Sequence, residues 1–386
     1  MRTITDIKDL KGKRVLLRAD FNVPLTKTGD VLDDTRIRAE IPTINYLVSH
    51  GAKLVICSHL GRPSGYEAGL SLFPVATRLM KYFPDRVKFS NKVVGQEAER
   101  LAKNLKEGEI LLLENLRFEP GEETCDKAFA KQLASFGELF VNDAFGTIHR
   151  KHASNFGVAS ILPSYVGFLI DSEVTAIENA YDNPKHPLVA VFGGAKVKDK
   201  LKVINRFLEV CDTILIGGGM AYTFLVAKGI NVGDSLVSTD NIEDARKTLE
   251  KAEKLGKKIV LPVDHVALVN GKVKKVDELE RGMKGFDIGA KTIKLFVEEI
   301  KKANEIIWNG PLGKYEEKRF SKGTFKIAKA IAKSSAYTLV GGGDSVSAIN
   351  ICHLADKISH LSTGGGASLK LLEGAYLASL EIIREK

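Results

Sequence analysis

The sequence LVAVFGG at residues 188–194 is a run of five apolar residues that ends in two glycines. An uninterrupted apolar run predicts a strand buried on both faces, as in a parallel sheet covered by helices. Between such runs the apolar residues follow a helical period; Ile41, Ile44 and Leu47, for example, share one stripe that stops at Gly51. Further apolar runs occupy residues 14–18, 54–58, 110–113, 139–142, 213–216, 259–262, 306–309, 337–340 and 358–361. The alternation predicts an α/β fold.

The length of the chain predicts two domains, since 386 residues exceed the roughly 250–300 that one hydrophobic core accommodates. A helix near residues 171–187, capped by Asp171 or Ser172 and ended by Pro184 and Pro187, is the expected boundary. We therefore expect two doubly wound parallel-sheet (Rossmann-like) lobes joined by a hinge helix. Ligands of such sheets bind at the carboxyl ends of the strands, so both lobes are expected to line one cleft.

Composition indicates a soluble cytoplasmic protein. Residues 1–13 carry charge throughout, unlike a signal peptide, and no apolar run approaches the ~20 residues that span a bilayer. The cysteines Cys57, Cys125, Cys211 and Cys352 are far apart and form no C-x-x-C pair, which favours reduced thiols. The net charge of +9 comes mostly from lysines scattered along helical segments such as 247–258. We therefore expect small anions as partners, and neither nucleic acid nor a membrane.

Polar residues follow the strands of the first half of the chain, at the points where strands end or helices begin. Guanidinium groups bind phosphate and carboxylate with two parallel charge-assisted hydrogen bonds, and Asp20 and Asn22 could bind a substrate hydroxyl. One arginine at a strand end is usually a surface ion-pair residue, so the prediction of an anion site rests on the repetition. The members of this set are Arg18, Asp20, Asn22, Arg36, His59, Arg62, Arg117, His149, Arg150 and His152.

Glycine clusters follow the strands of the second half, at residues 193–194, 217–219, 341–343 and 364–366. Glycine after a buried strand lets the backbone approach a ligand, and the helix that follows directs its N-terminal amides at negative charge. Nucleotide phosphates are the expected ligand, although neither a Walker A motif nor a G-x-G-x-x-G fingerprint occurs. Asp344 could hold Mg²⁺ through one carboxylate and the phosphates, or cap a helix.

Two lysines follow the first of these glycine clusters. Lys196 and Lys200 are four residues apart, so a helix that starts after Gly194 would carry them on one face. Lysines at a helix N-terminus oppose the macrodipole unless an anion binds there. A phosphate would remove that conflict, whereas Lys198 and Lys202 are expected to face solvent.

The chain resembles the phosphoglycerate kinase family over essentially its whole length. The resemblance rests on long motifs in a fixed order: RADFNVP (18–24), SHLGRP (58–63), ENLRF (114–118), NDAFGTIHRKH (142–152), GGAKVKDK (193–200), IGGGMAYTF (216–224), WNGPLGKYE (308–316), GGGDS (341–345) and STGGGASL (362–369).

The resemblance implies a substrate lobe of residues 1–170 plus 371–386, a hinge helix and linker of 171–187, and a nucleotide lobe of 188–370. It further implies that an apolar stripe of Leu372, Tyr376 and Leu380 returns to the first lobe. 3-Phosphoglycerate or 1,3-bisphosphoglycerate would bind at Asp20, Asn22, Arg36, His59, Arg62, Arg117, His149 and Arg150. ADP or ATP would bind at Gly194, Lys196, Lys200, Gly218, Gly219, Asn309, Pro311, Gly313, Glu316, Gly342, Gly343, Asp344 and Ser345.

The implied reaction is a reversible phosphoryl transfer from 1,3-bisphosphoglycerate to ADP, by a monomer. Arg36, Lys196 and Gly365 would be its catalytic residues and Asp344 its ligand for Mg²⁺. The acceptor in the reverse direction is a carboxylate, which is ionised at pH 7, so no general base is needed. The alternatives are a two-lobed anion receptor without catalysis, a nucleotide-dependent dehydrogenase, and a kinase for another small acid.

Overall fold

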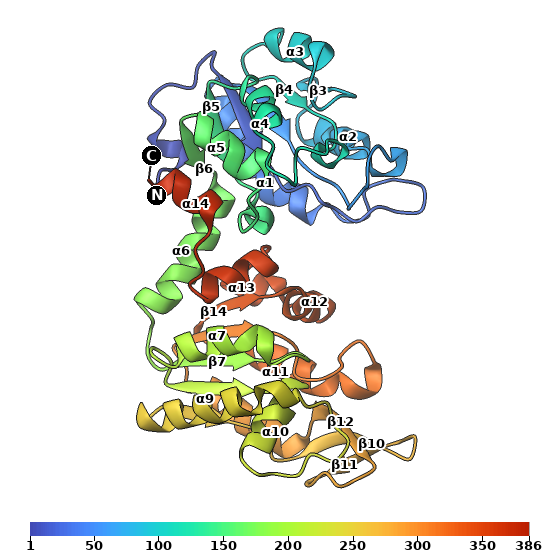
Figure 1. Cartoon of the computed structure of the whole chain (residues 1–386), viewed down its shortest axis with the longest axis vertical. Helices are drawn as coiled ribbons and strands as arrows, with labels where there is room; N and C mark the ends of the chain where they lie inside the picture. Colours follow the sequence, from blue (N-terminus) through green and yellow to red (C-terminus); the bar gives the residue numbers. More distant parts are fainter. Residues whose placement is uncertain (386) are drawn as a thin grey trace. The chain divides into compact units, whose positions relative to one another are not determined.

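The structure, a computed structural model, describes residues 1–385 and divides into two compact units. The first contains Met1–Val174 and the chain from Tyr376 on, and the second contains Thr175–Ala375. The division falls inside helix α6 (Phe168–Asp182), so this helix links the two units (Figure 1). Among the helices of residues 1–385, none combines the length and the apolar character that crossing a membrane requires.

The first unit is built on a six-stranded parallel sheet with the order β3-β4-β2-β1-β5-β6. Its central strands are almost wholly buried, because helices cover both faces. The chain leaves β1 toward β2 on one side and reaches β5 on the other, so the topological switch point lies between β1 and β5. The strands are β1 (Arg14–Arg18), β2 (Lys53–Cys57), β3 (Val87–Phe89), β4 (Ile110–Leu112), β5 (Leu139–Asn142) and β6 (Ser164–Val166).

Amphipathic helices enclose this sheet. In α1, the buried face includes Ile37, Ile44 and Leu47, and the chain then turns at Gly51 with a positive φ of 79°. In α4, the side chain of Asp126 caps the helix by accepting from the amide of Phe129 at 2.8 Å. The helices are α1 (Thr35–Ser49), α2 (Phe73–Tyr82), α3 (Gln96–Lys103), α4 (Lys127–Ala134), α5 (Val158–Ile161) and α14 (Ala378–Arg384).

The second unit has a six-stranded parallel sheet with the order β15-β14-β13-β7-β8-β9. This is the doubly wound order of dinucleotide-binding folds, with its switch point between β7 and β13. A separate antiparallel sheet, β11-β10-β12, extends the same unit (Figure 1). The strands are β7 (Leu188–Phe192), β8 (Thr213–Ile216), β9 (Lys258–Val260), β10 (His265–Val269), β11 (Lys272–Val276), β12 (Met283–Ile288), β13 (Glu305–Asn309), β14 (Tyr337–Gly341) and β15 (His360–Leu361).

Helices also cover the parallel sheet of the second unit. The core between them is built around Trp308, whose indole Nε1 donates to the carbonyl oxygen of Gly310 at 2.8 Å. The helices are α7 (Lys198–Phe207), α8 (Met220–Ala227), α9 (Ile242–Lys254), α10 (Ala290–Ile300), α11 (Lys322–Ala332), α12 (Gly343–Ile351) and α13 (Gly366–Leu372). The four cysteines are free thiols.

The two doubly wound parallel sheets confirm the predicted fold class, but some details differ. The linking helix begins at Phe168, three residues before the expected cap Asp171. The expected C-terminal stripe is not one helix. Leu372 is buried at the end of α13 in the second unit, Tyr376 is 74% exposed between the helices, and Leu380 is buried in α14 of the first unit. α14 packs against α5 and β6 of the first unit.

Candidate functional site

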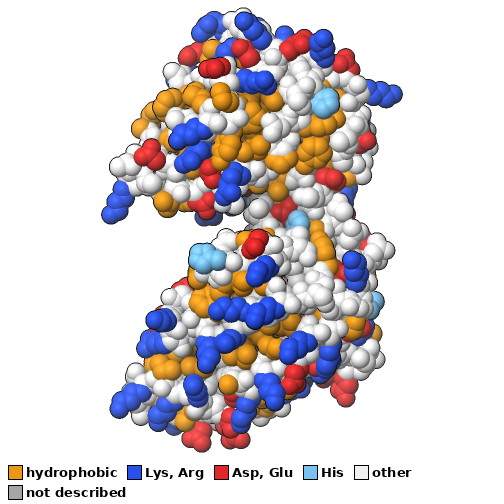
Figure 2. Space-filling view, turned by 180° about the vertical axis from the view of Figure 1, so that it is seen from behind, with side chains coloured by type: hydrophobic (Ala, Val, Ile, Leu, Met, Phe, Trp, Pro, Cys, Tyr) orange, Lys and Arg blue, Asp and Glu red, His pale blue; other side chains and the backbone are white. Residues whose placement is uncertain are grey.

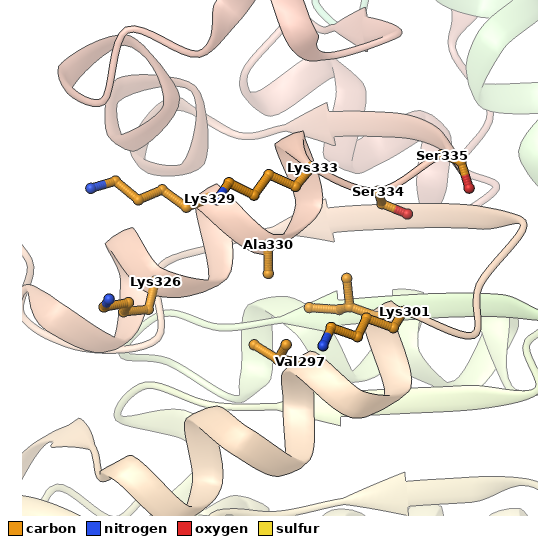
Figure 3. A pocket seen from close by; sticks show the side chains of 9 residues that line it. Val297, Lys301, Lys326, Lys329, Ala330, Lys333, Ser334 and Ser335 are labelled. Atoms are coloured by element: carbon orange, nitrogen blue, oxygen red, sulfur yellow. The ribbon is translucent and has the colours of Figure 1, made fainter.

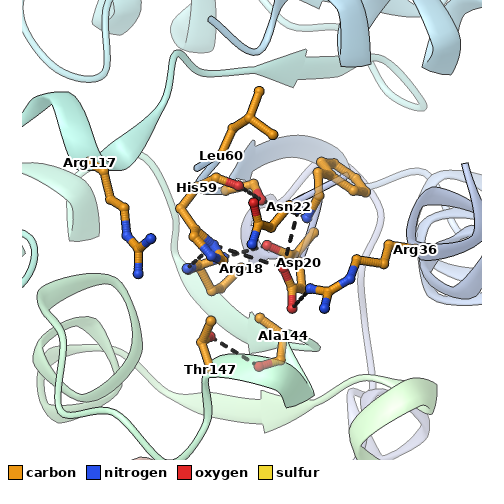
Figure 4. A network of polar contacts seen from close by, with 12 residues as sticks. Arg18, Asp20, Asn22, Arg36, His59, Leu60, Arg117, Ala144 and Thr147 are labelled. Carbon is orange, nitrogen blue, oxygen red and sulfur yellow. Dashed lines mark hydrogen bonds and ion pairs between the residues drawn. The ribbon is translucent and has the colours of Figure 1, made fainter. Parts of the chain in front are cut away.

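The carboxylate of Asp20, directly after β1, organises a polar cluster in the first unit (Figure 4). Its Oδ2 atom accepts from Nη1 of Arg36 at 2.6 Å, and its Oδ1 atom lies 3.9 Å from Nδ1 of His59. Arg36 is on the first turn of α1 and His59 follows β2, so the cluster forms at the carboxyl edge of the sheet. Asn22 is fixed beside it, because its Oδ1 atom accepts from the amide of Gly61 at 2.9 Å.

The pKa values of Asp20 and His59 are both lowered in this cluster. Burial alone would raise the pKa of Asp20, but Arg36, His59 and Arg18 outweigh it and hold that pKa below its usual value. Burial and the nearby Arg18 lower the pKa of His59 well below its usual range. Asp20 is therefore a carboxylate and His59 a neutral imidazole at pH 7.

The tautomer of His59 follows from its neighbour. Nη2 of Arg18 contacts Nδ1 of His59 at 3.2 Å, and a guanidinium can only donate. Nδ1 is therefore the acceptor and the ring proton is on Nε2. His59 can thus donate a hydrogen bond from Nε2 to a ligand oxygen.

Arg18 itself is a support, which sequence reasoning did not distinguish from the exposed arginines. It is fully buried, and its Nε donates to Oγ of Ser154 at 2.8 Å. That hydroxyl donates to Glu122 at 2.6 Å, and Nδ1 of His152 lies 3.7 Å from the same carboxylate. Burial would raise the pKa of Glu122, but the hydrogen bonds with His152 and Ser154 and the charge of Arg18 lower it. The sequence does not reveal Glu122 and Ser154 as partners of Arg18, because both are in polar segments that give no sign that these side chains are buried.

Arg62 and Arg150, the other two arginines of the predicted anion site, lie close enough to Arg117 to affect its pKa. Burial lowers the pKa of Arg117, and the positive charges of Arg150, Arg18 and Arg62 lower it further, while Glu123 opposes them. Arg117 donates to the carbonyl oxygen of Gly61 and lies 3.1 Å from Glu123. Mutual repulsion among cations held this close is relieved when an anion binds between them.

The loop that carries His149 and Arg150 is half-buried at the surface of the first unit. Oγ of Ser379 in α14 donates to the carbonyl oxygen of Arg150 at 3.0 Å, so the C-terminal helix holds this loop. Gly146 approaches the cluster so closely that a Cβ atom there would lie 2.4 Å from Oδ2 of Asp20.

The second unit has a cavity of about 480 Å³ at the carboxyl edge of its sheet, at the switch point between β7 and β13. It is a glycine-rich hollow whose charged side chains are Lys196, Asp199, Lys200 and Asp344. Nine of the residues expected to bind the nucleotide or the phosphoryl group line this cavity: Gly194, Lys196, Lys200, Asn309, Pro311, Gly342, Gly343, Asp344 and Gly365.

The glycines here allow backbone segments to touch. A Cβ atom on Gly193 would lie 2.1 Å from the carbonyl oxygen of Pro311, and one on Gly218 would lie 2.7 Å from the same atom. The amide of Gly194 donates to that oxygen at 2.8 Å, and the amide of Gly218 donates to Leu312 at 3.0 Å. Two of the predicted glycine turns are therefore used to join neighbouring loops. The amides expected to be available to an anion are instead those of the first turn of α12 (Gly343–Ile351), because the first amides of a helix have no carbonyl partner within it.

The two predicted lysines do not share a helical face, which corrects the expectation from their spacing. α7 begins only at Lys198, and Lys196 lies in the preceding loop with its side chain exposed. Lys200 is in the first turn and donates to Oδ1 of Asn309. Burial lowers the pKa of Lys200 to about 8, against the opposing influence of Asp199 and Asp344. Both lysines nevertheless line the cavity.

Asp344 is an exposed carboxylate in the first turn of α12, and its Oδ1 atom accepts from the hydroxyl of Tyr315 at 3.4 Å. Ser345 is buried and its Oγ accepts from the amide of Gly310 at 2.6 Å, so it supports the loop after β13. The expected nucleotide residues that do not line the cavity are Gly218, Gly219, Gly313, Glu316 and Ser345.

A second hollow of about 440 Å³ lies between α10 and α11, away from the carboxyl ends of the strands (Figure 3). Lys301, Lys326, Lys329 and Lys333 surround an apolar floor that includes Val297. Basic side chains are also widely spread on the face that Figure 2 shows, with acidic ones among them. This hollow contains none of the predicted site residues.

Two parallel-sheet units, one with a cationic cluster and one with a glycine-lined cavity at the sheet edge, define a two-lobed α/β kinase. The family model for phosphoglycerate kinase matches residues 4–375. The chain belongs to the phosphoglycerate kinase family. Members of this family are phosphotransferases that act on a carboxyl group.

Individual relatives agree over full length. The chain is 49% identical to phosphoglycerate kinase of Chloroflexus aurantiacus, covering 100% of this chain and 99% of the relative. It is 45% identical to that of Clostridium tetani, covering 100% and 98%. The solved structure of phosphoglycerate kinase from Coxiella burnetii has a TM-score of 0.89 at 37% identity, covering 99% and 98% of the two chains. That from Pyrococcus horikoshii has a TM-score of 0.85 at 35% identity, covering 100% and 98%.

Proposed function

We propose that the first unit binds 3-phosphoglycerate through the cluster around Asp20, and that the glycine-lined cavity binds ADP or ATP. The observation that carries this proposal is the position of the Asp20 carboxylate, 2.6 Å from Nη1 of Arg36 and 3.9 Å from Nδ1 of His59. Such a cluster suits a ligand that has anionic groups and a hydroxyl, because the arginines bind the anions. The carboxylate of Asp20 accepts a hydrogen bond from the hydroxyl of the ligand. Nε2 of His59 donates either to that hydroxyl or to the carboxylate of the ligand.

The reaction of the family moves a phosphoryl group between the acyl phosphate of 1,3-bisphosphoglycerate and ADP. In the direction of acyl phosphate synthesis the nucleophile is a carboxylate, whose pKa lies near ~3–4. No proton has to be removed from it, so the protein needs to orient two anions and to neutralise their repulsion. The cluster in the first unit serves this purpose with fixed cations and with no general base.

Arg36, Lys196 and the backbone of Gly365 are proposed to stabilise the phosphoryl group in transit. The guanidinium of Arg36 has five N–H donors and uses one of them in its hydrogen bond to Asp20. Lys196 is exposed at the cavity, and Gly365 lines the same cavity just before α13. Each donor of this kind contributes about 3 kcal/mol to the transition state.

The nucleotide would bring Mg²⁺ with it. Asp344 offers one exposed carboxylate at the cavity, which fits an ion that takes one protein carboxylate and completes its shell with phosphate oxygens and waters. Bound there, Mg²⁺ would neutralise charge on the phosphates. The chain's own contribution is to hold the phosphates with Lys196, Lys200 and the first amides of α12.

Arg36 and Lys196 belong to different units. We propose that binding of both substrates closes the units about α6, which excludes water from the acyl phosphate. We further propose that the protein acts as a monomer in the cytoplasm.

A coupled assay of the purified protein with 3-phosphoglycerate and Mg-ATP tests the proposal. Turnover that requires 3-phosphoglycerate is expected, with neither acetate nor aspartate as a substitute. Turnover with acetate or aspartate alone would point to a kinase for another small acid.

A further inference from the structure

Two carboxyl groups lie together in the interior of the first unit, beneath the cluster around Asp20. Glu40 and Asp143 are both fully buried, and their carboxyl groups lie close enough that each affects the pKa of the other. Glu40 is on α1 and Asp143 follows β5. The structure gives neither carboxyl an ion pair with a lysine, arginine or histidine within residues 1–385. Two carboxylates without a cation cannot share such a site, so one proton must be present.

The hydrogen-bond donors decide which carboxyl carries that proton. Asp143 accepts from the hydroxyl of Thr43 at 2.5 Å and from the amide of Ile170 at 2.9 Å. Oε1 of Glu40 accepts from the amide of Asp20 at 2.9 Å, whereas its buried Oε2 accepts from no donor in the described chain. Asp143 is therefore surrounded by donors and is the carboxylate. Oε2 of Glu40 is the atom left to donate, and it can do so only when protonated.

The pair joins two functional elements. Through Glu40 it holds the backbone of Asp20, and through Asp143 it holds the first turn of α6 at Ile170. Thr43 reinforces the second link, because its hydroxyl oxygen also accepts from the amide of Phe168 at 2.9 Å. Glu40 and Thr43 are both on α1, so this helix already joins the two links, and the contact between the carboxyl groups adds a direct connection between them.

We propose that Glu40 is a positioning residue of the kinase, which holds a proton permanently and donates it to Asp143, so that the Asp20 loop is fixed against the start of α6. The functional part of this inference rests on the proposed binding of 3-phosphoglycerate at Asp20.

The charges that face the pair support a retained proton. Burial raises the pKa of Glu40 well above its usual value, and the negative charges of Asp143 and Asp20 raise it further. Burial raises the pKa of Asp143 to about 6, while Thr43, Ile170, Glu40 and Leu169 lower it through hydrogen bonds. Arg36 is the nearby cation, but its contact is with Oδ2 of Asp20.

The raised pKa of Glu40 makes its contribution to stability depend on pH. A carboxyl whose folded pKa is raised favours the folded state most below its unfolded pKa, and this contribution is lost as pH rises toward the folded pKa. Glu40→Gln keeps an acceptor for Asp20 and gains a permanent NH₂ donor for Asp143. The melting temperature of Glu40→Gln relative to wild type should therefore rise steadily between pH 5 and pH 8.5.

Three variants of the intact protein test the proposal. Glu40→Leu should raise KM for 3-phosphoglycerate at least tenfold and leave KM for Mg-ATP within twofold, and Glu40→Gln should restore most of this loss. Asp143→Asn should behave like Glu40→Leu, because its NH₂ group opposes the donors of Thr43 and Ile170. If Glu40→Leu does not fold, the proposal is tested by KM for 3-phosphoglycerate in the other two variants, which should be near wild type in Glu40→Gln and raised in Asp143→Asn.

Carboxyl ¹³C NMR of glutamate-labelled protein gives a readout that does not depend on activity. At pH 7, one glutamate carboxyl should have the shift of a protonated acid, and Glu40→Gln should remove that signal. The proposal is overturned if all glutamates are ionised at pH 7, if the melting curves of wild type and Glu40→Gln run parallel with pH, or if Glu40→Gln is as impaired as Glu40→Leu. A wild type without kinase activity would instead refute the proposed function and leave the NMR and melting results valid.

Discussion

Nη1 of Arg36 donates to Oδ2 of Asp20 at 2.6 Å, so the arginine proposed for catalysis is oriented by the carboxylate proposed to bind the substrate hydroxyl. The ion pair leaves the side chain of Arg36 38% exposed. Arg36 is thereby held in one position while its remaining N–H groups stay available to an incoming phosphoryl group.

Arg36→Ala should lower kcat at least ~100-fold in a protein that still folds, because it removes a donor to the transition state. Arg38→Ala is the matched control, since Arg38 is on the same helix and pairs with Asp34 at the surface. Steady-state kinetics of both variants check this expectation. Near-normal turnover of Arg36→Ala would remove Arg36 from the mechanism.

Lys196→Ala should also lower kcat at least ~100-fold. Lys198→Ala serves as the control, because it is exposed two residues further on and does not line the cavity. Single-turnover measurements separate the chemical step from product release. Equal rates for the two variants would contradict the role of Lys196.

Affinity for Mg-ADP should fall as pH rises above 8. Lys200 has a pKa of about 8, and only its charged form attracts phosphate, so binding must take up a proton once the free lysine is neutral. The dissociation constant should increase about tenfold per pH unit above that value until the lysine of the complex also titrates.

Titration calorimetry in buffers of different ionisation enthalpy measures this proton uptake. Lys200→Met should bind weakly with no uptake, and Lys202→Met, altered at an exposed position of the same helix, should match wild type. A pH-independent affinity in wild type would exclude Lys200 from phosphate binding.

Asp344→Asn should raise the Mg²⁺ concentration needed for half-maximal rate about tenfold or more, and chelation of Mg²⁺ should abolish turnover. Asp199→Asn is the informative comparison, since Asp199 is the other carboxylate that lines the cavity. If Asp199→Asn shows the greater Mg²⁺ requirement, the assignment of Asp344 is wrong.

The radius of gyration in solution should decrease only when 3-phosphoglycerate and a nucleotide are both bound, since each unit holds one of the two proposed catalytic cations. Small-angle X-ray scattering of free, singly liganded and doubly liganded protein measures the change. An unchanged radius in the doubly liganded state would count against closure about α6.

The sequence predicts the central strands well, because a buried parallel strand needs a continuous apolar run. It does not reveal β3, whose half-buried residues include Lys88, or β11, whose four lysine and valine positions 272–275 are all exposed. These strands form by pairing with neighbouring strands, and their own side chains are only partly buried or exposed.

The same distinction applies to the sites. Residues at strand ends could be predicted, since parallel strands bring them to one edge. The helix start at Lys198 could not be inferred from the spacing of Lys196 and Lys200, because the close contact of Gly193 with Pro311 sets the path of the loop. Long-range partners such as Glu122 for Arg18 exist only in the folded chain.

The hydrogen bond from Ser379 to the carbonyl of Arg150 has a consequence for protein synthesis. Residues 175–375 form one uninterrupted unit, whereas the first unit also needs α14. On the ribosome, the half of the protein that emerges first therefore waits for its final helix until the other half has been translated. The unit that begins to be synthesised first is therefore completed last. In a chain that stalls before residue 378, the loop that carries His149 and Arg150 lacks its hydrogen bond from Ser379.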